Sequence, residues 1–247
     1  MEIKTKGVVL GRTFVGEKDA IIKILTENSG VISASAKGIK SMKSKLSAGC
    51  SLFSYSDFLL TESKGRYIVA STSLCEGFYG LSANIERLSY ATYAAEAAAA
   101  ISPDATDARA LIPLLLNTFY LFSNSQKNLR LIKCVFELRL LCLLGYAPEL
   151  NGCVECGDTD ELCFFSPSEG GIVCRSCGNL PDTQIITKDT LTAMRYVQDA
   201  DNKKAFSFSL PRQNLDEFEA ATEKMLENIT GYKLHSLSYL KQIAGRT

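Results

Sequence analysis

Four cysteines in two matched pairs carry the most specific chemical signal in the sequence. The pairs stand in Cys153-Val154-Glu155-Cys156 and Cys174-Arg175-Ser176-Cys177, and a glycine follows each pair. A gap of two residues lets both thiolates of a pair converge on one metal ion. Glycine permits the positive φ that turns backbone N–H groups toward sulfur. The spacing therefore predicts one structural zinc ion with tetrahedral coordination by Cys153, Cys156, Cys174 and Cys177.

Four thiolates fill the zinc coordination sphere and leave no position for water, so we expect the metal to stabilise structure and not to activate a nucleophile. The alternative is a redox dithiol, which needs one such pair at the start of a helix, and two matched pairs fit it poorly. Between the pairs, Phe164-Phe165 and Ile172-Val173 flank a turn and predict the hairpin of a zinc ribbon. The remaining five cysteines are scattered and are predicted to pack in the core: Cys50, Cys75, Cys134, Cys142 and Cys163.

A second signal is a stretch from Asn28 to Ser56 that contains no acidic residue. It holds four lysines within nine residues, Lys37, Lys40, Lys43 and Lys45. Such a cluster could follow a phosphate backbone, with Arg12 and Arg66 extending the surface. A solvated, flexible loop is the alternative. Phe14, Tyr55 and Tyr67 could stack on bases, although a core position is the more ordinary interpretation for each of them.

Motifs for catalysis are missing from the sequence. It contains no GxxxxGK[ST], GxGxxG, HExxH or GxSxG pattern. His235 is the only histidine, and because nothing beside it marks a nucleophile, a packing or surface role is expected for it. Glu17 and Asp19 are interpreted as residues of a solvated turn. The sequence therefore predicts no catalytic residues and a protein that is not an enzyme.

The elements that must position these residues fall into two classes. Five short strand patterns occupy the first eighty residues: 7–10, 20–26, 31–36, 52–60 and 66–70. Five short antiparallel strands cannot bury both faces of a flat sheet, so we expect a small barrel of the OB type. From residue 84 onward the apolar period changes to about 3.6. Helices are predicted at 84–101, 107–122, 129–144, 188–199, 215–229 and 235–243.

The predicted fold class is α+β. It comprises an N-terminal OB-fold barrel (1–80), an α-helical domain (81–150 and 181–247) and a zinc ribbon inserted in it (151–180). The net charge of zero divides into +5 for residues 1–66 and −5 for the rest, which makes the barrel the candidate polyanion surface. No signal-peptide pattern and no long apolar run is present, so a cytoplasmic protein without a membrane partner is expected.

Together these features resemble the RecO family of bacterial recombination mediators over nearly the whole chain. The resemblance rests on Lys6–Leu10, Gly16–Asp19 and Ala36–Ser41, on Phe136–Leu141 and Leu144–Pro148 running into the first cysteine pair, and on Lys233–Leu237. It implies a protein that binds single- and double-stranded DNA and anneals complementary strands. It also implies partnership with RecR and help for RecA in displacing the single-stranded-DNA-binding protein, at the nucleoid during repair.

By position in the matching basic motif, Lys37 and Lys40 are the DNA contacts that the resemblance implies most directly, followed by Lys43 and Lys45. The family also docks the acidic tail of the single-stranded-DNA-binding protein on its helical domain, for which Lys133 and Arg139 are the candidates here. Two rival classes stay open. One is an RNA-binding or transcription-associated protein with an OB fold and zinc ribbon, and the other is an enzyme whose catalytic residues are dispersed along the chain.

Overall fold

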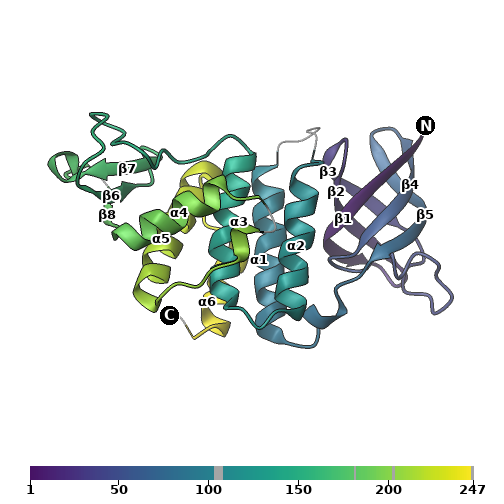
Figure 1. Ribbon diagram of the computed structural model, residues 1–247. Coiled ribbons are helices and arrows are strands. Elements are labelled where there is room, and N and C mark those ends of the chain that lie inside the picture. The colour runs from purple at the N-terminus through teal and green to yellow at the C-terminus, as the bar shows by residue number, and fades with distance from the viewer. Residues whose placement is uncertain (103–107, 181, 202–203, 246–247) are drawn as a thin grey trace. The chain divides into compact units, whose positions relative to one another are not determined.

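The computed structural model describes residues 1–102, 108–180, 182–201 and 204–245 (Figure 1). The chain forms two compact units, Met1–Asn124 with Ser238–Thr247, and Ser125–Leu237. None of the helices in the described ranges is both long and apolar enough to cross a membrane.

A closed five-stranded barrel begins the first unit. Its strands are β1 (Glu2–Val15), β2 (Asp19–Thr26), β3 (Gly30–Ala36), β4 (Tyr55–Ser63) and β5 (Arg66–Glu76), in the order β1-β2-β3-β5-β4. Neighbours are antiparallel except β3 and β5, which pair in parallel at Ser35 and Ile68. The closed barrel confirms the predicted OB fold, because closure removes the sheet edges that five short strands would otherwise expose.

Residues alternate along β2 between the barrel core and solvent. Ala20, Ile22 and Ile24 are fully buried, whereas Ile21 and Lys23 are exposed, as expected for side chains that point to opposite faces of a strand. The barrel core is completed mainly by aliphatic residues from the other strands and from the segment that follows β3: Val9, Ala34, Ala36, Ile39, Cys50, Phe58, Leu60 and Val69.

Two helices and a short 3-10 turn, η1 (Tyr79–Leu81), complete most of the first unit. The helix α1 (Ile85–Ile101) begins where the Asn84 side chain accepts hydrogen bonds from the N–H groups of Glu86 and Arg87, at 2.8 and 3.1 Å. It packs against α2 (Leu111–Asn124) and β1. The ring of Phe119 in α2 lies 5.0 Å from that of Phe53, so aromatic packing joins α2 to the barrel.

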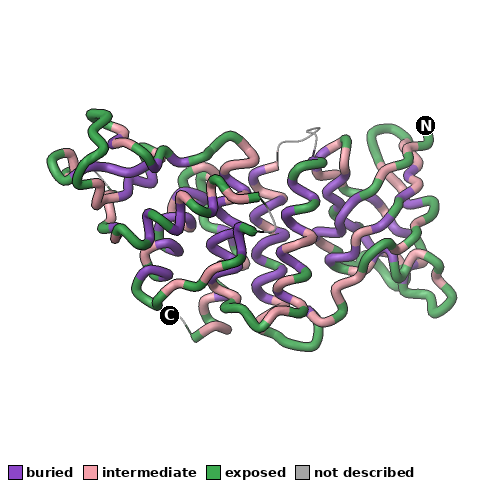
Figure 2. Tube along the Cα trace, viewed as in Figure 1, coloured by how far each residue is buried: buried purple, intermediate pink, exposed green. Residues whose placement is uncertain are grey.

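The second unit combines helices with a small sheet. The helix α3 (Leu129–Leu143) packs against α4 (Lys188–Asp199) and α5 (Arg212–Thr230). A short 3-10 turn, η3 (Lys204–Phe206), lies between α4 and α5 in the chain. The sheet has the order β7-β6-β8, from β6 (Leu162–Ser166), β7 (Gly171–Cys174) and β8 (Gln184–Ile185), and η2 (Arg175–Cys177) follows β7. The last helix, α6 (His235–Ile243), begins in the second unit, and its residues from Ser238 onward belong to the first. Buried and exposed residues alternate along α4 and α5, whereas the residues of α3 are all buried or intermediate (Figure 2).

Most predicted elements occur within a few residues of their expected bounds. The helix expected at 107–122 is observed as Leu111–Asn124, and residue 107 itself lies outside the described residues, as does the expected domain boundary at 181. One strand prediction was wrong at its start. Residues 52–54 are not part of β4, because Phe53 is buried with a left-handed backbone, φ 66°, and its N–H donates to the carbonyl of Val9 at 2.8 Å.

Candidate nucleic-acid interface and metal centre

The four predicted cysteine ligands meet at one point in the second unit. Cys174 ends β7, Cys177 lies in η2, and Cys153 and Cys156 come from the turn before β6. All four sulfur atoms lie within 4.8 Å of one another. A zinc–sulfur distance of about 2.3 Å would place two tetrahedral thiolates about 3.8 Å apart, and the sulfur atoms of Cys156 and Cys174 are 3.7 Å apart. The donor set therefore fits a tetrahedral metal ion.

The two glycines that follow the cysteine pairs serve different purposes. Gly157 has the predicted positive φ, 76°, and its N–H donates to the carbonyl of Cys153 at 2.8 Å. Gly178 does not have a positive φ, because its φ is −68°. A Cβ atom at Gly178 would come within 2.5 Å of the Phe164 ring. The second glycine is thus required by close packing against β6, and the sequence-based explanation was wrong for it.

Backbone groups around Cys153 favour its thiolate form. Burial by itself would raise the pKa of Cys153, but hydrogen bonds from the backbone at Cys174, Cys156 and Glu155 lower that pKa to about 6. A metal ligand must be deprotonated, so this environment suits metal binding. The core-packing prediction for the other cysteines holds for Cys50 and Cys134, which are buried, but not for Cys75, which is exposed.

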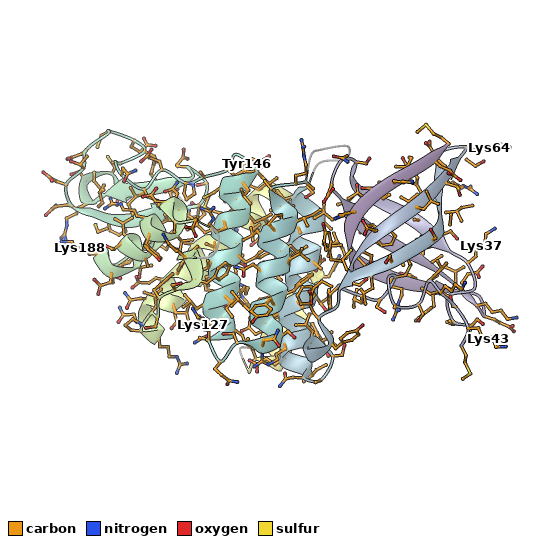
Figure 3. All side chains as sticks on the ribbon, turned by 45° about the vertical axis from the view of Figure 1, so that its right-hand side comes forward. Lys37, Lys43, Lys64, Lys127, Tyr146 and Lys188 are labelled. Carbon is orange, nitrogen blue, oxygen red and sulfur yellow. The ribbon has the colours of Figure 1, made fainter. Side chains whose placement is uncertain are left out.

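The four predicted lysines lie on the segment between β3 and β4, in residues 37–45, which we call the lysine loop. All four side chains are exposed, as are Ser41 and Met42, whereas Ile39 is buried. Figure 3 shows Lys37 and Lys43 projecting from the side of the barrel away from α1 and α2. The structure therefore brings the predicted cations to one end of the barrel.

Hydrogen bonds fix the backbone of the lysine loop to the turn between β1 and β2. The N–H of Gly38 donates to the Asp19 carboxylate at 2.8 Å, and the N–H of Lys40 donates to the carbonyl of Lys18 at 3.1 Å. Ile39 is buried in the barrel core between these anchors. The loop is thus tethered, not free, and Asp19 has an anchoring role that the interpretation as a solvated turn residue missed.

The two predicted arginines also lie on the barrel surface. Arg12 is exposed on β1, and Arg66 is exposed at the start of β5, two residues before Ile68, which pairs with Ser35 of β3. In the part of the chain that the structure describes, none of the ion pairs involves these arginines or the four lysines. Their charges are therefore not neutralised within the protein.

The three aromatic candidates for stacking have different surroundings. Tyr67 is half-buried and packs against the barrel core. The Tyr55 hydroxyl donates to a carboxylate oxygen of Glu27 at 3.2 Å, and burial together with that carboxylate raises the pKa of Tyr55 to about 12. Phe14, in contrast, is 49% exposed. Of the three side chains, only that of Phe14 is exposed.

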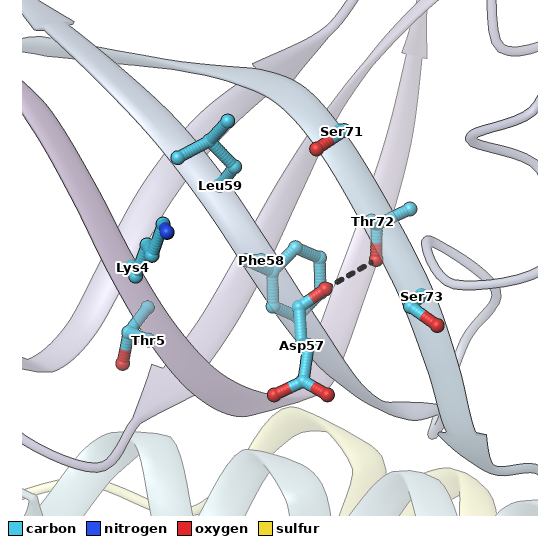
Figure 4. Close-up of a pocket in the computed structure, with 8 residues that line it drawn as sticks. All are labelled: Lys4, Thr5, Asp57, Phe58, Leu59, Ser71, Thr72 and Ser73. Carbon is cyan, nitrogen blue, oxygen red and sulfur yellow. Dashed lines mark hydrogen bonds between the residues drawn. The ribbon is translucent and has the colours of Figure 1, made fainter.

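A groove of about 370 Å³ lies on another part of the barrel, on β1, β4 and β5 (Figure 4). Hydroxyl side chains line much of it, and the Thr72 hydroxyl donates to the carbonyl of Asp57 at 3.0 Å. Lys4 and Asp57 are its two charged residues, so it has no excess of positive charge. The lysine loop is therefore the better candidate for a polyanion.

Lys133, a candidate for peptide-tail binding, is enclosed between α3 and α5. Its side chain is 1% exposed, and its ammonium lies 2.9 Å from Glu137, 2.7 Å from Glu223 and 3.6 Å from Glu219. Arg130 forms ion pairs with Asp216 and Glu219 beside it. An external tail cannot reach this ammonium in the observed arrangement, which argues against Lys133 as its ligand. Glu137 is one helical turn from Lys133, but Glu219 and Glu223 come from α5, about ninety residues away, so this enclosure could not be inferred from adjacent residues.

Arg139, the second candidate, connects α3 to the end of α4. Its guanidinium donates to the carbonyls of Val197 at 3.3 Å and Gln198 at 2.9 Å. The last carbonyls of a helix have no partner within the helix, so this arginine caps α4 from the side. The side chain is half-buried, and part of it stays open to solvent.

Known protein families and individual known proteins match nearly the full length of the chain. The family described as recombination protein O N terminal matches residues 1–78, and the one described as recombination protein O C terminal matches residues 82–238. A DNA repair protein RecO from Acetivibrio thermocellus is 33% identical over 244 residues, 98% of this chain and 97% of the relative. One from Alkaliphilus metalliredigens is 38% identical over 186 residues, 75% and 76% of the two chains.

Proposed function

The chain belongs to the RecO family of DNA repair proteins, and from this premise we propose that it is a recombination mediator without catalytic turnover. In this role it binds single- and double-stranded DNA and anneals complementary single strands. With RecR, it helps to load RecA on DNA that is coated by the single-stranded-DNA-binding protein. The observation that supports DNA binding best is the lysine loop, whose four cations are exposed and not neutralised on one end of an OB-fold barrel.

The DNA contacts proposed are Lys37 and Lys40 first, then Lys43 and Lys45, with Arg12 and Arg66 on the adjoining strands. Each cation that meets a phosphate releases condensed counterions, which makes binding favourable and dependent on salt. Two strands held on such a surface repel one another less, because bound cations offset their charges. Annealing then follows from base pairing and needs no chemical step by the protein.

The remaining partners and the metal follow from the same family membership. We propose one zinc ion in the four-cysteine site, where it holds the ribbon in its fold. For the tail of the single-stranded-DNA-binding protein, Arg139 is the better of the two candidates, since Lys133 is enclosed by carboxylates. The site of action is the cytoplasm, at the nucleoid during repair.

An annealing assay tests this function directly. Purified protein is mixed with two complementary DNA oligomers, and pairing is followed by fluorescence at low and moderate salt. We expect pairing to be faster than without protein, and the effect to weaken as salt increases. If pairing is not accelerated while structured RNA is bound tightly, the alternative of an RNA-binding protein with an OB fold and zinc ribbon replaces the proposal. Purification with RecR tests the partnership separately.

A further inference from the structure

An exposed phenylalanine lies beside two cations at the end of β1. The ring of Phe14 is 49% exposed. The guanidinium carbon of Arg12 lies 4.9 Å from its centroid, and the ammonium nitrogen of Lys40 lies 4.4 Å from it. Both distances are within the range of cation–π attraction. The lysine loop and β1 therefore meet at this ring.

The strand register explains how the three side chains come together. Phe14 pairs with Ala20 and Arg12 pairs with Ile22 in the antiparallel β1–β2 ladder. Paired residues point to the same side of a sheet, and Ala20 and Ile22 are buried in the barrel core. Arg12 and Phe14 thus lie on the core side of the sheet, at the end of the barrel that Lys40 covers, but they extend into solvent.

A groove continues from this point. Arg12 lines a hollow of about 190 Å³ together with Ser51, Leu52 and Tyr79, among other residues. Leu52 is 36% exposed and Tyr79 is 72% exposed, so the groove has apolar and aromatic surface. A chain that contacts Phe14 and Arg12 can continue along the barrel in this groove. Arg12 thus contacts the Phe14 ring and also lines the groove.

We propose that Phe14 stacks on an unpaired base of a DNA strand, while Arg12 and Lys40 contact the phosphates on either side of it. The inference rests on the proposed DNA-binding function and adds selectivity for single strands to it. Proteins that bind single strands combine cations for the backbone with aromatic rings for the bases. Bases within a duplex already stack on their neighbours and offer no free face to Phe14. Phosphates, in contrast, are present in single strands and in duplexes, so the lysines alone cannot distinguish single-stranded from double-stranded DNA.

The first test compares Phe14→Leu with the wild-type protein. Affinities are measured for a thymidine oligomer, for a blunt duplex and for an abasic oligomer of the same length as the thymidine strand. Stacking contributes about 1–3 kcal/mol per base, a factor of about 5 to 150. We expect Phe14→Leu to lose affinity for the thymidine strand by a factor in this range and to bind duplex as before. The wild-type protein should bind the abasic strand about as weakly as the variant binds thymidine.

The second test places a fluorescent ring at the same position. The protein contains no tryptophan, so Phe14→Trp introduces a single tryptophan, whose selectively excited emission a stacked base would quench. The matched control is Tyr232→Trp, at an exposed position in the second unit. We expect the thymidine strand to quench the emission of Phe14→Trp, whereas the abasic strand and the duplex leave it nearly unchanged. Emission of the control should not respond to any of the three.

Three outcomes overturn the assignment. Equal affinity of Phe14→Leu and the wild-type protein for the thymidine strand, without quenching of Phe14→Trp, would show that the ring does not contact bases, although DNA binding by the lysines would remain. Equal quenching by the abasic strand would show that the backbone alone perturbs this site. If the wild-type protein bound no DNA, the proposed function would fail and this inference with it.

Discussion

The ammonium nitrogen of Lys133 lies 2.9 Å from a carboxylate oxygen of Glu137, one helical turn further along α3, and both side chains are almost completely buried. Glu219 and Glu223 of α5 approach the same ammonium, and the hydroxyl of Thr222 donates to the other oxygen of Glu137 at 2.7 Å. Charges buried this deeply persist only when paired and hydrogen-bonded. The cluster therefore specifies how α3 and α5 pack.

Replacing Lys133 with methionine should destabilise the second unit strongly. The change leaves Glu137 buried without its cation, and breaking a buried pair from one side costs about 3–5 kcal/mol. Urea unfolding of Lys133→Met measures the loss. The control is Lys224→Met, because Lys224 and Glu227 are partly exposed and 3.6 Å apart, and such a pair contributes less than about 1 kcal/mol. If Lys133→Met loses no more free energy of unfolding than Lys224→Met, the buried cluster is not a stabilising contact.

Replacing Cys153 with serine should abolish metal binding and unfold the ribbon locally. A structural tetrathiolate site depends on all four ligands, and its binding energy is folding energy. Metal analysis should give about one zinc ion per wild-type chain and almost none in Cys153→Ser, and amides of β6 and β7 should exchange faster. Cys163→Ser is the control, since that half-buried cysteine is outside the cluster. Retention of zinc by Cys153→Ser would contradict the site.

Local signals made much of the fold predictable. The Asn84 cap and the apolar spacing after it indicate a helix from 85 to 101, and α1 has these bounds. The cysteine spacing indicates four convergent sulfur atoms, and the structure brings them together. Caps, turns and short metal-binding spacings depend on neighbouring residues, so they are visible without knowledge of the tertiary structure.

Features set by distant partners were not predictable. The strand β1 extends to Glu2 and Val15, beyond the expected 7–10, because it pairs first with β4 and then with β2. A register shift between Val9 and Gly11 also interrupts the alternation that marks a strand in sequence. The burial of Lys133 depends on α5, and the exposure of Phe14 depends on the end of the barrel. Neither could be inferred from adjacent residues.

Acid should weaken the contact between α4 and α5 through Glu217. Burial by itself raises the pKa of this carboxyl, but hydrogen bonds from Thr190 and Thr187 outweigh it and hold the pKa below its ordinary value of 4.5. A lowered pKa in the folded state means that the carboxylate stabilises the fold above about pH 4.5 and that this contribution is lost as the pH falls further. Glu217→Gln should therefore be less stable than the wild-type protein at neutral pH, and the difference should shrink in acid.

Thermal unfolding of both proteins at neutral and acidic pH measures this effect. Metal release in acid is common to the two proteins, so the comparison between them isolates Glu217. A stability difference that does not change with pH would mean that the hydrogen bonds from Thr187 and Thr190 do not favour the ionised carboxyl.

Removing the Asp19 carboxylate should loosen the lysine loop. The N–H of Gly38 donates to this side chain at 2.8 Å, and Asp19→Ala leaves that donor without a protein acceptor. We expect faster hydrogen exchange at the Gly38 amide. Asp19→Asn retains an oxygen acceptor and should exchange at nearly the wild-type rate. Equal exchange in all three proteins would show that Asp19 does not hold the loop.

The salt dependence of DNA binding by the double variant Lys37→Ala, Lys40→Ala tests the central claim most directly. Log K falls as log salt increases, and each lost phosphate contact on a single strand makes this slope less steep by about 0.7. The variant should therefore bind more weakly, with a slope that is less steep by about 1.4. The control removes two exposed lysines of the second unit, Lys188→Ala with Lys233→Ala, and should keep the wild-type affinity and slope. Affinity and slope unchanged in the Lys37 and Lys40 variant would contradict a DNA interface at the lysine loop.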